Sequence, residues 1–255
     1  MAKIIAVVTQ KGGVGKTTSA VNLASAIAEA GKRCLLVDID PQGNATSGVG
    51  IDKRQVRLST YDLLSGSEES AHAALRTAFQ NLAVIPSSVA LAGAEIEMVD
   101  IPRRESRLKA ALAAYREQYD YIFIDCPPAL SKNTYNALVA ASKILIPVQM
   151  EALSVKGVSE VLSVMDEVKE FHMNDNLELL GLLPVMVDER TKITKQLSKL
   201  LGEKHGDLIL PCRIRRSVKF LEAQAHGQSI FEYAPYSSTG IDYEIAIKRM
   251  FNIKI

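Results

Sequence analysis

The chain has 255 residues, of which 47% are hydrophobic and 23% are charged, and its formal net charge is +1. These proportions are typical of a globular protein, and the length suffices for a single domain over residues 1–255 with a large core. No apolar run approaches the ~18 residues of a membrane span, and no leader-like segment precedes the first predicted strand, so we expect a cytoplasmic protein.

The first predicted elements are a strand, a glycine-rich loop and a helix. The run KIIAVV at 3–8 is apolar and β-branched, which is typical of a buried strand. The loop TQKGGVGKTT follows at 9–18, and then apolar residues at Ala20, Leu23, Ala24 and Ile27 repeat with helical spacing. Strand, glycine loop and helix together form the context in which a phosphate-binding loop occurs.

The residue types in this loop suit nucleotide phosphates. Gly12, Gly13 and Gly15 allow backbone N–H groups to turn toward phosphate oxygens, and the helix N-terminus adds the positive end of its dipole. Lys16 has the reach for the β- and γ-phosphates, and the Thr17 hydroxyl suits Mg²⁺. We count Val14 and Thr18 with the same site. The usual pattern begins with glycine, whereas this chain has Gln10.

The rest of the chain alternates between short apolar runs and helical stretches. This alternation predicts an α/β fold: a doubly wound, mostly parallel sheet with helices on both faces, as in P-loop NTPases. Residues 43–80 form an irregular and helical excursion over the sheet. We expect strands at 33–40, 82–87, 119–126, 143–149, 179–187 and 208–211, and helices at 104–118, 131–141, 154–171, 193–203, 217–224 and 241–251.

Carboxylates stand at the carboxyl ends of two of these strands. Asp38 and Asp40 end LLVDID, and Asp125 ends YIFID. Ligands of open α/β sheets bind at this edge, and a strand-end Asp opposite a phosphate loop commonly holds Mg²⁺ through water. Thr17, Asp38 and Asp125 are therefore candidates for the metal site. For Asp38 a purely structural role, hydrogen bonding to loop amides, stays open.

Positive charge is concentrated late in the chain. Residues 190–219 hold nine Lys and Arg against two acids, Glu203 and Asp207, which is a local charge of +7 on a chain of +1. Such a segment favours a polyanionic partner over a merely solvated face. The three cysteines, Cys34, Cys126 and Cys212, are widely spaced and form no ligand-like pair.

The sequences KGGVGKTT, DIDPQGN and IDCPP together resemble the ParA/MinD group of deviant-Walker ATPases, and within it the Soj-like ParA partition ATPases. The resemblance implies a nucleoid-associated, slowly hydrolysing ATPase that uses ATP and Mg²⁺. Such a protein forms a homodimer on binding ATP, binds non-specific DNA, is stimulated by a ParB-type protein, and positions a chromosome, plasmid or other cargo.

The resemblance also suggests roles for single residues. Lys11 matches the lysine that reaches the partner's phosphates across the dimer, so Lys11, Lys16 and Asp40 are the candidate catalytic residues. Asp40 matches the residue that positions the attacking water, and Asp125 matches the carboxylate linked to Mg²⁺. Arg190 and Lys219 occupy DNA-binding positions, although the second is usually Arg, and Arg215 and Arg216 extend the patch.

The chain departs from the family pattern at Lys132 and Asn133, where an apolar stretch is usual, and at Gln224, where proline is usual. Three alternatives remain beside the partition ATPase. A MinD-like membrane switch would use the basic tail IAIKRMFNIKI, although we do not expect membrane association. An iron–sulfur reductase would need a cysteine pair. A scaffold that binds ATP without hydrolysis would need no Asp40.

Overall fold

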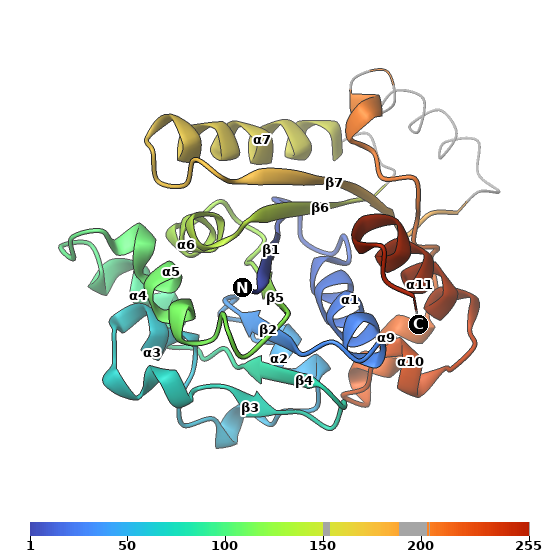
Figure 1. The fold of residues 1–255 in the computed structure, drawn as a ribbon, viewed down its shortest axis with the longest axis horizontal. Coiled ribbons are helices and arrows are strands. Elements are labelled where there is room, and N and C mark those ends of the chain that lie inside the picture. Colours follow the sequence, from blue (N-terminus) through green and yellow to red (C-terminus); the bar gives the residue numbers. More distant parts are fainter. Residues whose placement is uncertain (150–153, 189–202, 204, 255) are drawn as a thin grey trace.

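The computed structural model describes residues 1–149, 154–188, 203 and 205–254. Its centre is a seven-stranded sheet of order β3-β4-β2-β5-β1-β6-β7, in which only β3 runs antiparallel to its neighbour (Figure 1). The predicted doubly wound, mostly parallel fold is thereby confirmed. The strands are β1 (Lys3–Val7), β2 (Cys34–Asp38), β3 (Leu75–Arg76), β4 (Leu82–Ile85), β5 (Tyr121–Asp125), β6 (Lys143–Gln149) and β7 (Glu178–Val185).

Helices cover both faces of the sheet because its central strands are apolar on both sides, as parallel strands generally are. One face packs against α3 (Thr60–Ser65), α4 (Leu91–Glu97), α5 (Arg107–Ala111), α6 (Lys132–Ala140) and α7 (Ser154–Glu170). The other packs against α1 (Lys16–Glu29), α2 (Asn44–Gly48), α9 (Lys219–Ala225), α10 (Ile230–Tyr233) and α11 (Ser238–Phe251).

The excursion at 43–80 contains α2, α3, two 3₁₀ turns and the edge strand β3, which was not predicted. The helix expected at 104–118 is shorter than its pattern indicated. It consists of α5 between the 3₁₀ turns Arg104–Ser106 and Leu112–Ala114. Most of the helix expected at 193–203 lies outside the described residues.

The strand expected at 208–211 is wrong. Gly206–Leu208 form a 3₁₀ turn, and Ile209 makes only an isolated bridge to Leu182. The reason lies in β7, whose pairing with β6 skips a residue between Leu179 and Gly181, and which contains Pro184. Proline has no N–H to donate to a neighbouring strand. The segment after Leu208 therefore makes only isolated backbone hydrogen bonds to β7, and no continuous ladder forms.

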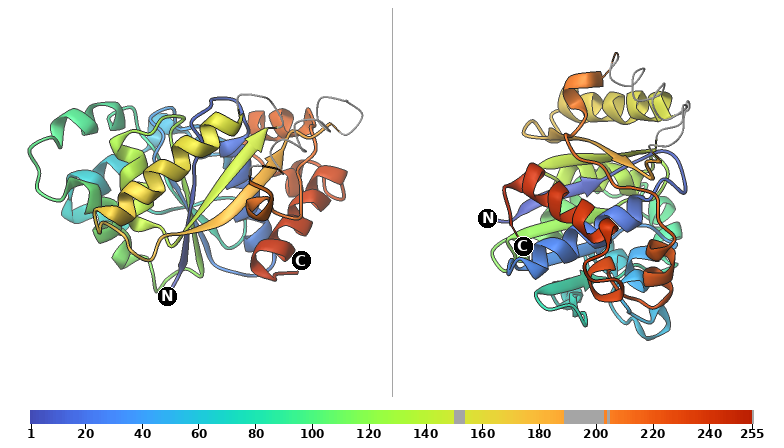
Figure 2. Two further views of the ribbon diagram at one scale, coloured as in Figure 1. Left: turned by 90° about the horizontal axis from the view of Figure 1, so that it is seen from above. Right: turned by 90° about the vertical axis from the view of Figure 1, so that its right-hand side faces the viewer.

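The C-terminal helix α11 packs beside α1, as the views in Figures 1 and 2 agree. Its Tyr243, Ala246 and Ile247 are buried, and the Phe251 ring meets those of Tyr121 and Phe123 edge-on at centroid distances of 5.4 and 6.2 Å. The apolar side chains of the tail are therefore largely used in the core.

This packing predicts that Phe251→Ala lowers the free energy of unfolding by about 3 kcal/mol, because the ring fills space between α11 and the sheet. Urea denaturation would measure the loss. Ile245→Ala is the matched control on the same helix: its side chain is 43% exposed, and we expect a loss below about 1 kcal/mol. Equal stability of the two variants would contradict the docked arrangement.

Candidate nucleotide-binding site

The glycine-rich loop joins β1 to α1 in a conformation that its glycines make possible. Gly13 and Gly15 have φ of 77° and 80°, in the left-handed region where a side chain would be strained. Gly15 is the N-cap of α1, and its carbonyl accepts the Ser19 N–H at 2.8 Å. Among the described residues no side chain caps this helix, so the loop and the first turn present backbone N–H groups to a ligand.

The three predicted carboxylates and Lys16 meet at the carboxyl edge of the sheet. The β2–β5 register places Asp38 opposite Asp125, with Val7 of β1 on the other side of Asp125. The Lys16 ammonium donates to Asp125 Oδ1 at 2.8 Å and lies 3.9 Å from Asp40 Oδ2. The Thr17 hydroxyl donates to Asp125 Oδ2 at 2.8 Å. Lys16 and all three aspartates are at least 94% buried.

The electrostatics of this cluster follow from its composition, because three carboxylates share one ammonium. Burial and the neighbouring Asp125 raise the pKa of Asp38 to about 7, against hydrogen bonds from Thr46 and Asp40 that lower it. Burial also raises the pKa of Asp125, opposed by Lys16 and Thr17. Burial alone would lower the pKa of Lys16, but Asp125 outweighs it and the pKa is raised. The cluster has an excess of negative charge that suits a divalent cation.

Asp38 differs from the other two aspartates in that its oxygens are engaged inside the protein. Its Oδ2 accepts both the N–H and the hydroxyl of Thr46 at 2.7 Å, and its Oδ1 accepts the Asp40 N–H at 3.2 Å. These bonds belong to the structural role that the sequence left open. Asp40 Oδ1 accepts the Gln42 N–H at 3.0 Å.

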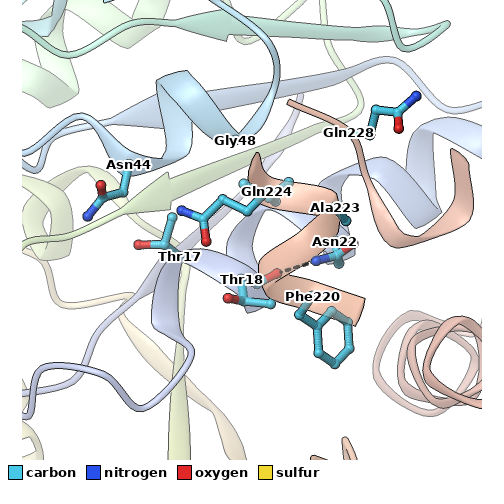
Figure 3. A pocket seen from close by; sticks show the side chains of 10 residues that line it. Thr17, Thr18, Asn22, Asn44, Gly48, Phe220, Ala223, Gln224 and Gln228 are labelled. Atoms are coloured by element: carbon cyan, nitrogen blue, oxygen red, sulfur yellow. Dashed lines mark hydrogen bonds between the residues drawn. The ribbon is translucent and has the colours of Figure 1, made fainter. Parts of the chain in front are cut away.

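Two hollows adjoin the start of α1. A largely apolar cavity of about 200 Å³ runs from Gly15, Thr18 and Ser19 past Met186 to Tyr243. Beside it a narrow cleft separates α1 from α2 and α9, with Thr17 and Thr18 at one side, Asn44 of α2 at another and Gln224 of α9 opposite (Figure 3). Gln224, the departure from the usual proline, thus lies next to the loop.

The other predicted site residues lie around this centre or apart from it. Lys11 is half-buried at the front of the loop. Arg216 and Lys219 are exposed, and Arg190 lies outside the described residues. Arg215 forms a two-pronged ion pair with Asp242 of α11, with bonds of 2.8 and 2.7 Å. The three cysteines are buried, and burial raises the pKa of each thiol.

Sequence reasoning missed Thr46, Ser87 and Asp242, which contact predicted site residues. Ser87 has the same signal as the aspartates, since it is a polar residue just beyond a buried strand, LAVI. For Thr46 and Asp242 no local signal exists, because their partners Asp38 and Arg215 lie on other elements.

The family described as AAA domain matches residues 2–179. The sporulation initiation inhibitor protein Soj of Bacillus subtilis is 46% identical over 93% of each chain, and the chromosome partitioning protein ParA of Caulobacter vibrioides is 39% identical over 91% of this chain and 87% of its own. The chain belongs to the Soj/ParA family of chromosome-partitioning ATPases.

A solved structure extends this family relation to the fold. Cobyrinic acid a,c-diamide synthase from Mycobacterium smegmatis, crystallised with an ATP analog and magnesium, matches with a TM-score of 0.85 and 32% identity. The match covers 100% of this chain and 98% of that one. The Soj/ParA fold of the present chain is therefore shared by a protein whose crystals contain a nucleotide and a metal ion.

We predict that Lys16→Met lowers the free energy of unfolding in the absence of nucleotide by about 3 kcal/mol, because it leaves Asp125 buried without its cationic partner. Urea denaturation would measure the difference. Lys32→Met, at an exposed lysine, is the matched control and should change stability by no more than about 0.5 kcal/mol. Unchanged stability of Lys16→Met would refute the buried pair.

Proposed function

We propose that the protein is an ATP-dependent DNA-binding switch: it dimerises with ATP, binds non-specific DNA, hydrolyses ATP slowly, and responds to a ParB-type partner. The observation that carries the proposal is the convergence of Lys16, Thr17 and Asp125 below a glycine loop, in a chain of the Soj/ParA family. Its cargo is a chromosome, a plasmid or another large assembly, and its proposed place in the cell is the nucleoid.

ATP would bind along the loop. The backbone N–H groups of residues 11–18 and the ammonium of Lys16 would hold the phosphates, and the cavity of about 200 Å³ would take the base. The donor set at the sheet edge suits Mg²⁺, with the Thr17 hydroxyl and Asp125 as its nearest protein groups. Mg²⁺ would neutralise charge on the β- and γ-phosphates. The oxygens of Asp38 already accept hydrogen bonds from Thr46 and Asp40, so Asp38 would act on the metal ion through its charge and not as a direct ligand.

Two further side chains would complete the hydrolytic site. Asp40 would orient the attacking water, and it lies close enough to Lys16, at 3.9 Å, to act on the same phosphate. Lys11 would act on the phosphates of a second copy of the chain. A cation supplied in this way makes dimerisation depend on ATP, and in arginine-finger systems it is worth roughly 10³–10⁵ in kcat.

The DNA contacts would come from the basic segment at 190–219. Of its described residues, Arg216 and Lys219 are exposed, which suits contact with phosphates. The charge of Arg215 is largely neutralised by Asp242, so we propose that Arg215 contributes less to DNA binding than Arg216 and Lys219 do. We propose a DNA contact for Arg190 from its place in the sequence alone, because Arg190 lies outside the described residues.

The packing of α11 favours this function over the membrane alternative, because Tyr243, Ile247 and Phe251 are already engaged in the protein. In the part of the chain that the structure describes, no helix combines the length and apolar character needed to cross a bilayer.

The switch predicts nucleotide-dependent DNA binding. Fluorescent duplex DNA of arbitrary sequence, at fixed moderate salt, should be bound with ATP and not with ADP. Asp40→Ala should prolong the bound state, since hydrolysis would end it, and Lys16→Ala should abolish binding. DNA binding by Lys16→Ala at the wild-type level would exclude the proposed mechanism.

The basic segment predicts a salt effect. Lys219→Ala should weaken DNA binding and reduce the slope of log K against log salt by about 0.9, the amount expected for one phosphate contact. Lys32→Ala, an exposed lysine outside the segment, is the matched control and should leave the slope unchanged. Identical slopes for both variants would remove Lys219 from the DNA-binding surface.

A further inference from the structure

Three hydroxyl side chains lie directly behind the site aspartates. Thr46, Thr60 and Ser87 come from α2, α3 and the loop after β4, and each has a relative exposure of 0%. Burying a hydroxyl costs free energy unless it is hydrogen-bonded, so what these groups bond to indicates what they do. The Thr46 hydroxyl bonds to the Asp38 side chain, the Thr60 hydroxyl to the Asp38 and Pro86 carbonyls, and the Ser87 hydroxyl to the Asp40 carbonyl.

The hydroxyls hold the chain where the sheet stops. The ladder between β2 and β4 ends at Val37 opposite Ile85. Beyond it, the Thr60 hydroxyl lies 2.7 Å from the carbonyl oxygen of Asp38 and 3.2 Å from that of Pro86. The Ser87 hydroxyl donates to the Asp40 carbonyl at 2.5 Å. Side chains thus continue a connection that backbone pairing has ended.

A second connection runs through Thr46. The Ser87 N–H donates to Thr46 Oγ1 at 2.9 Å, and that hydroxyl donates to Asp38 Oδ2 at 2.7 Å. Asp38 Oδ1 in turn accepts the Asp40 N–H at 3.2 Å. Asp40 is therefore fixed on both sides of its Cα: Asp38 accepts its N–H, and its carbonyl accepts both the Ser87 hydroxyl and, at 2.9 Å, the Gly43 N–H.

We propose that Ser87 is a positioning residue for ATP hydrolysis, which acts by fixing the backbone of Asp40, with Thr46 as its link to Asp38. This inference rests on the proposed role of Asp40 in orienting water. Such a role needs a rigid carboxylate, because a displacement of ~1 Å in a catalytic group can cost about 10²-fold in rate. Ser87 touches neither the loop nor Lys16 in the described contacts, so it should affect hydrolysis more than ATP binding.

The chain supplies a matched control in the adjacent residue. Ser88 lies on the same loop, but its hydroxyl contacts Ser59 Oγ at 3.0 Å, next to α3 and away from Asp40. Ser87→Ala and Ser88→Ala thus delete the same atom one residue apart, and only the first deletes a bond to Asp40.

The test measures single-turnover hydrolysis of labelled ATP by excess full-length protein with Mg²⁺, and the affinity for a fluorescent ATP analogue. We expect Ser87→Ala to hydrolyse about tenfold more slowly, because the loss of one hydrogen bond to the Asp40 carbonyl leaves the Asp40 carboxylate less well positioned, with analogue affinity within about twofold of wild type. Ser88→Ala should match wild type in both measurements. Ser87→Ala combined with Asp40→Ala should be no slower than Asp40→Ala alone, because both act through one group.

Several outcomes would overturn the inference. Wild-type hydrolysis by Ser87→Ala, an equal loss in Ser88→Ala, or a further loss on top of Asp40→Ala would each do so. If Ser87→Ala does not fold, Ser87→Cys keeps the shape with a weaker donor, and its hydrolysis should still fall below wild type at unchanged analogue affinity. Wild-type hydrolysis by Asp40→Ala itself would instead contradict the proposed function.

Discussion

The ion pair between Lys16 and Asp125 is the interaction on which the rest of the site depends. It joins the first residue of α1 to the last residue of β5 at 2.8 Å, with the side chain of Lys16 7% exposed and that of Asp125 fully buried. Removing two charges from water is expensive, and a buried pair seldom repays the cost in stability. Its value lies in geometry, because it holds the ammonium and the Thr17 hydroxyl at the mouth of the glycine loop.

The parallel sheet explains why the site is so acidic. Strands that run in the same direction all deliver their carboxyl ends to one edge, so Asp38 and Asp125 must become neighbours once β2 pairs with β5. Like charges in that position repel, which is one reason why the pKa of Asp38 is raised. Thr46, Thr17 and the Asp40 N–H reduce the cost by donating to these carboxylates. The result is a buried cluster of three carboxylates and one ammonium, which is held together at a cost in stability.

The sequence predicted a structural feature correctly where neighbouring residues determine that feature. Strand β5 and its Asp125 could be predicted because YIFID is a β-branched, apolar run that stops at a single carboxylate and two prolines. The loop at 9–18 could likewise be predicted from its glycines. Prediction failed where the deciding partner lies far along the chain: Asp242 binds Arg215, which is 27 positions away, and no local pattern marks either residue as half of an ion pair. The strand expected at 208–211 failed for the same reason, since Pro184 of β7 decides what can pair there.

Arg215 also shows why the charge of a segment is not the charge of a surface. The sequence counts it among nine basic residues, but Asp242 accepts its backbone N–H and both prongs of its guanidinium. Asp242 belongs to α11, which is outside the residues 2–179 that the AAA domain family matches.

That C-terminal part is nevertheless fastened to the nucleotide-site helix. The Ile230 N–H donates to Asn22 Oδ1 of α1 at 2.8 Å, and the Tyr243 hydroxyl donates to Ser19 Oγ at 3.4 Å. The exposed Arg216 lines the cavity that begins at Gly15, and the exposed Lys219 is the first residue of α9, which contacts α10. These bonds join α1 to α10 and α11, and α11 in turn holds Arg215 through Asp242. For a protein in which nucleotide is proposed to control DNA binding, these bonds are a physical connection between the helix at the glycine loop and the C-terminal part that carries Arg216 and Lys219.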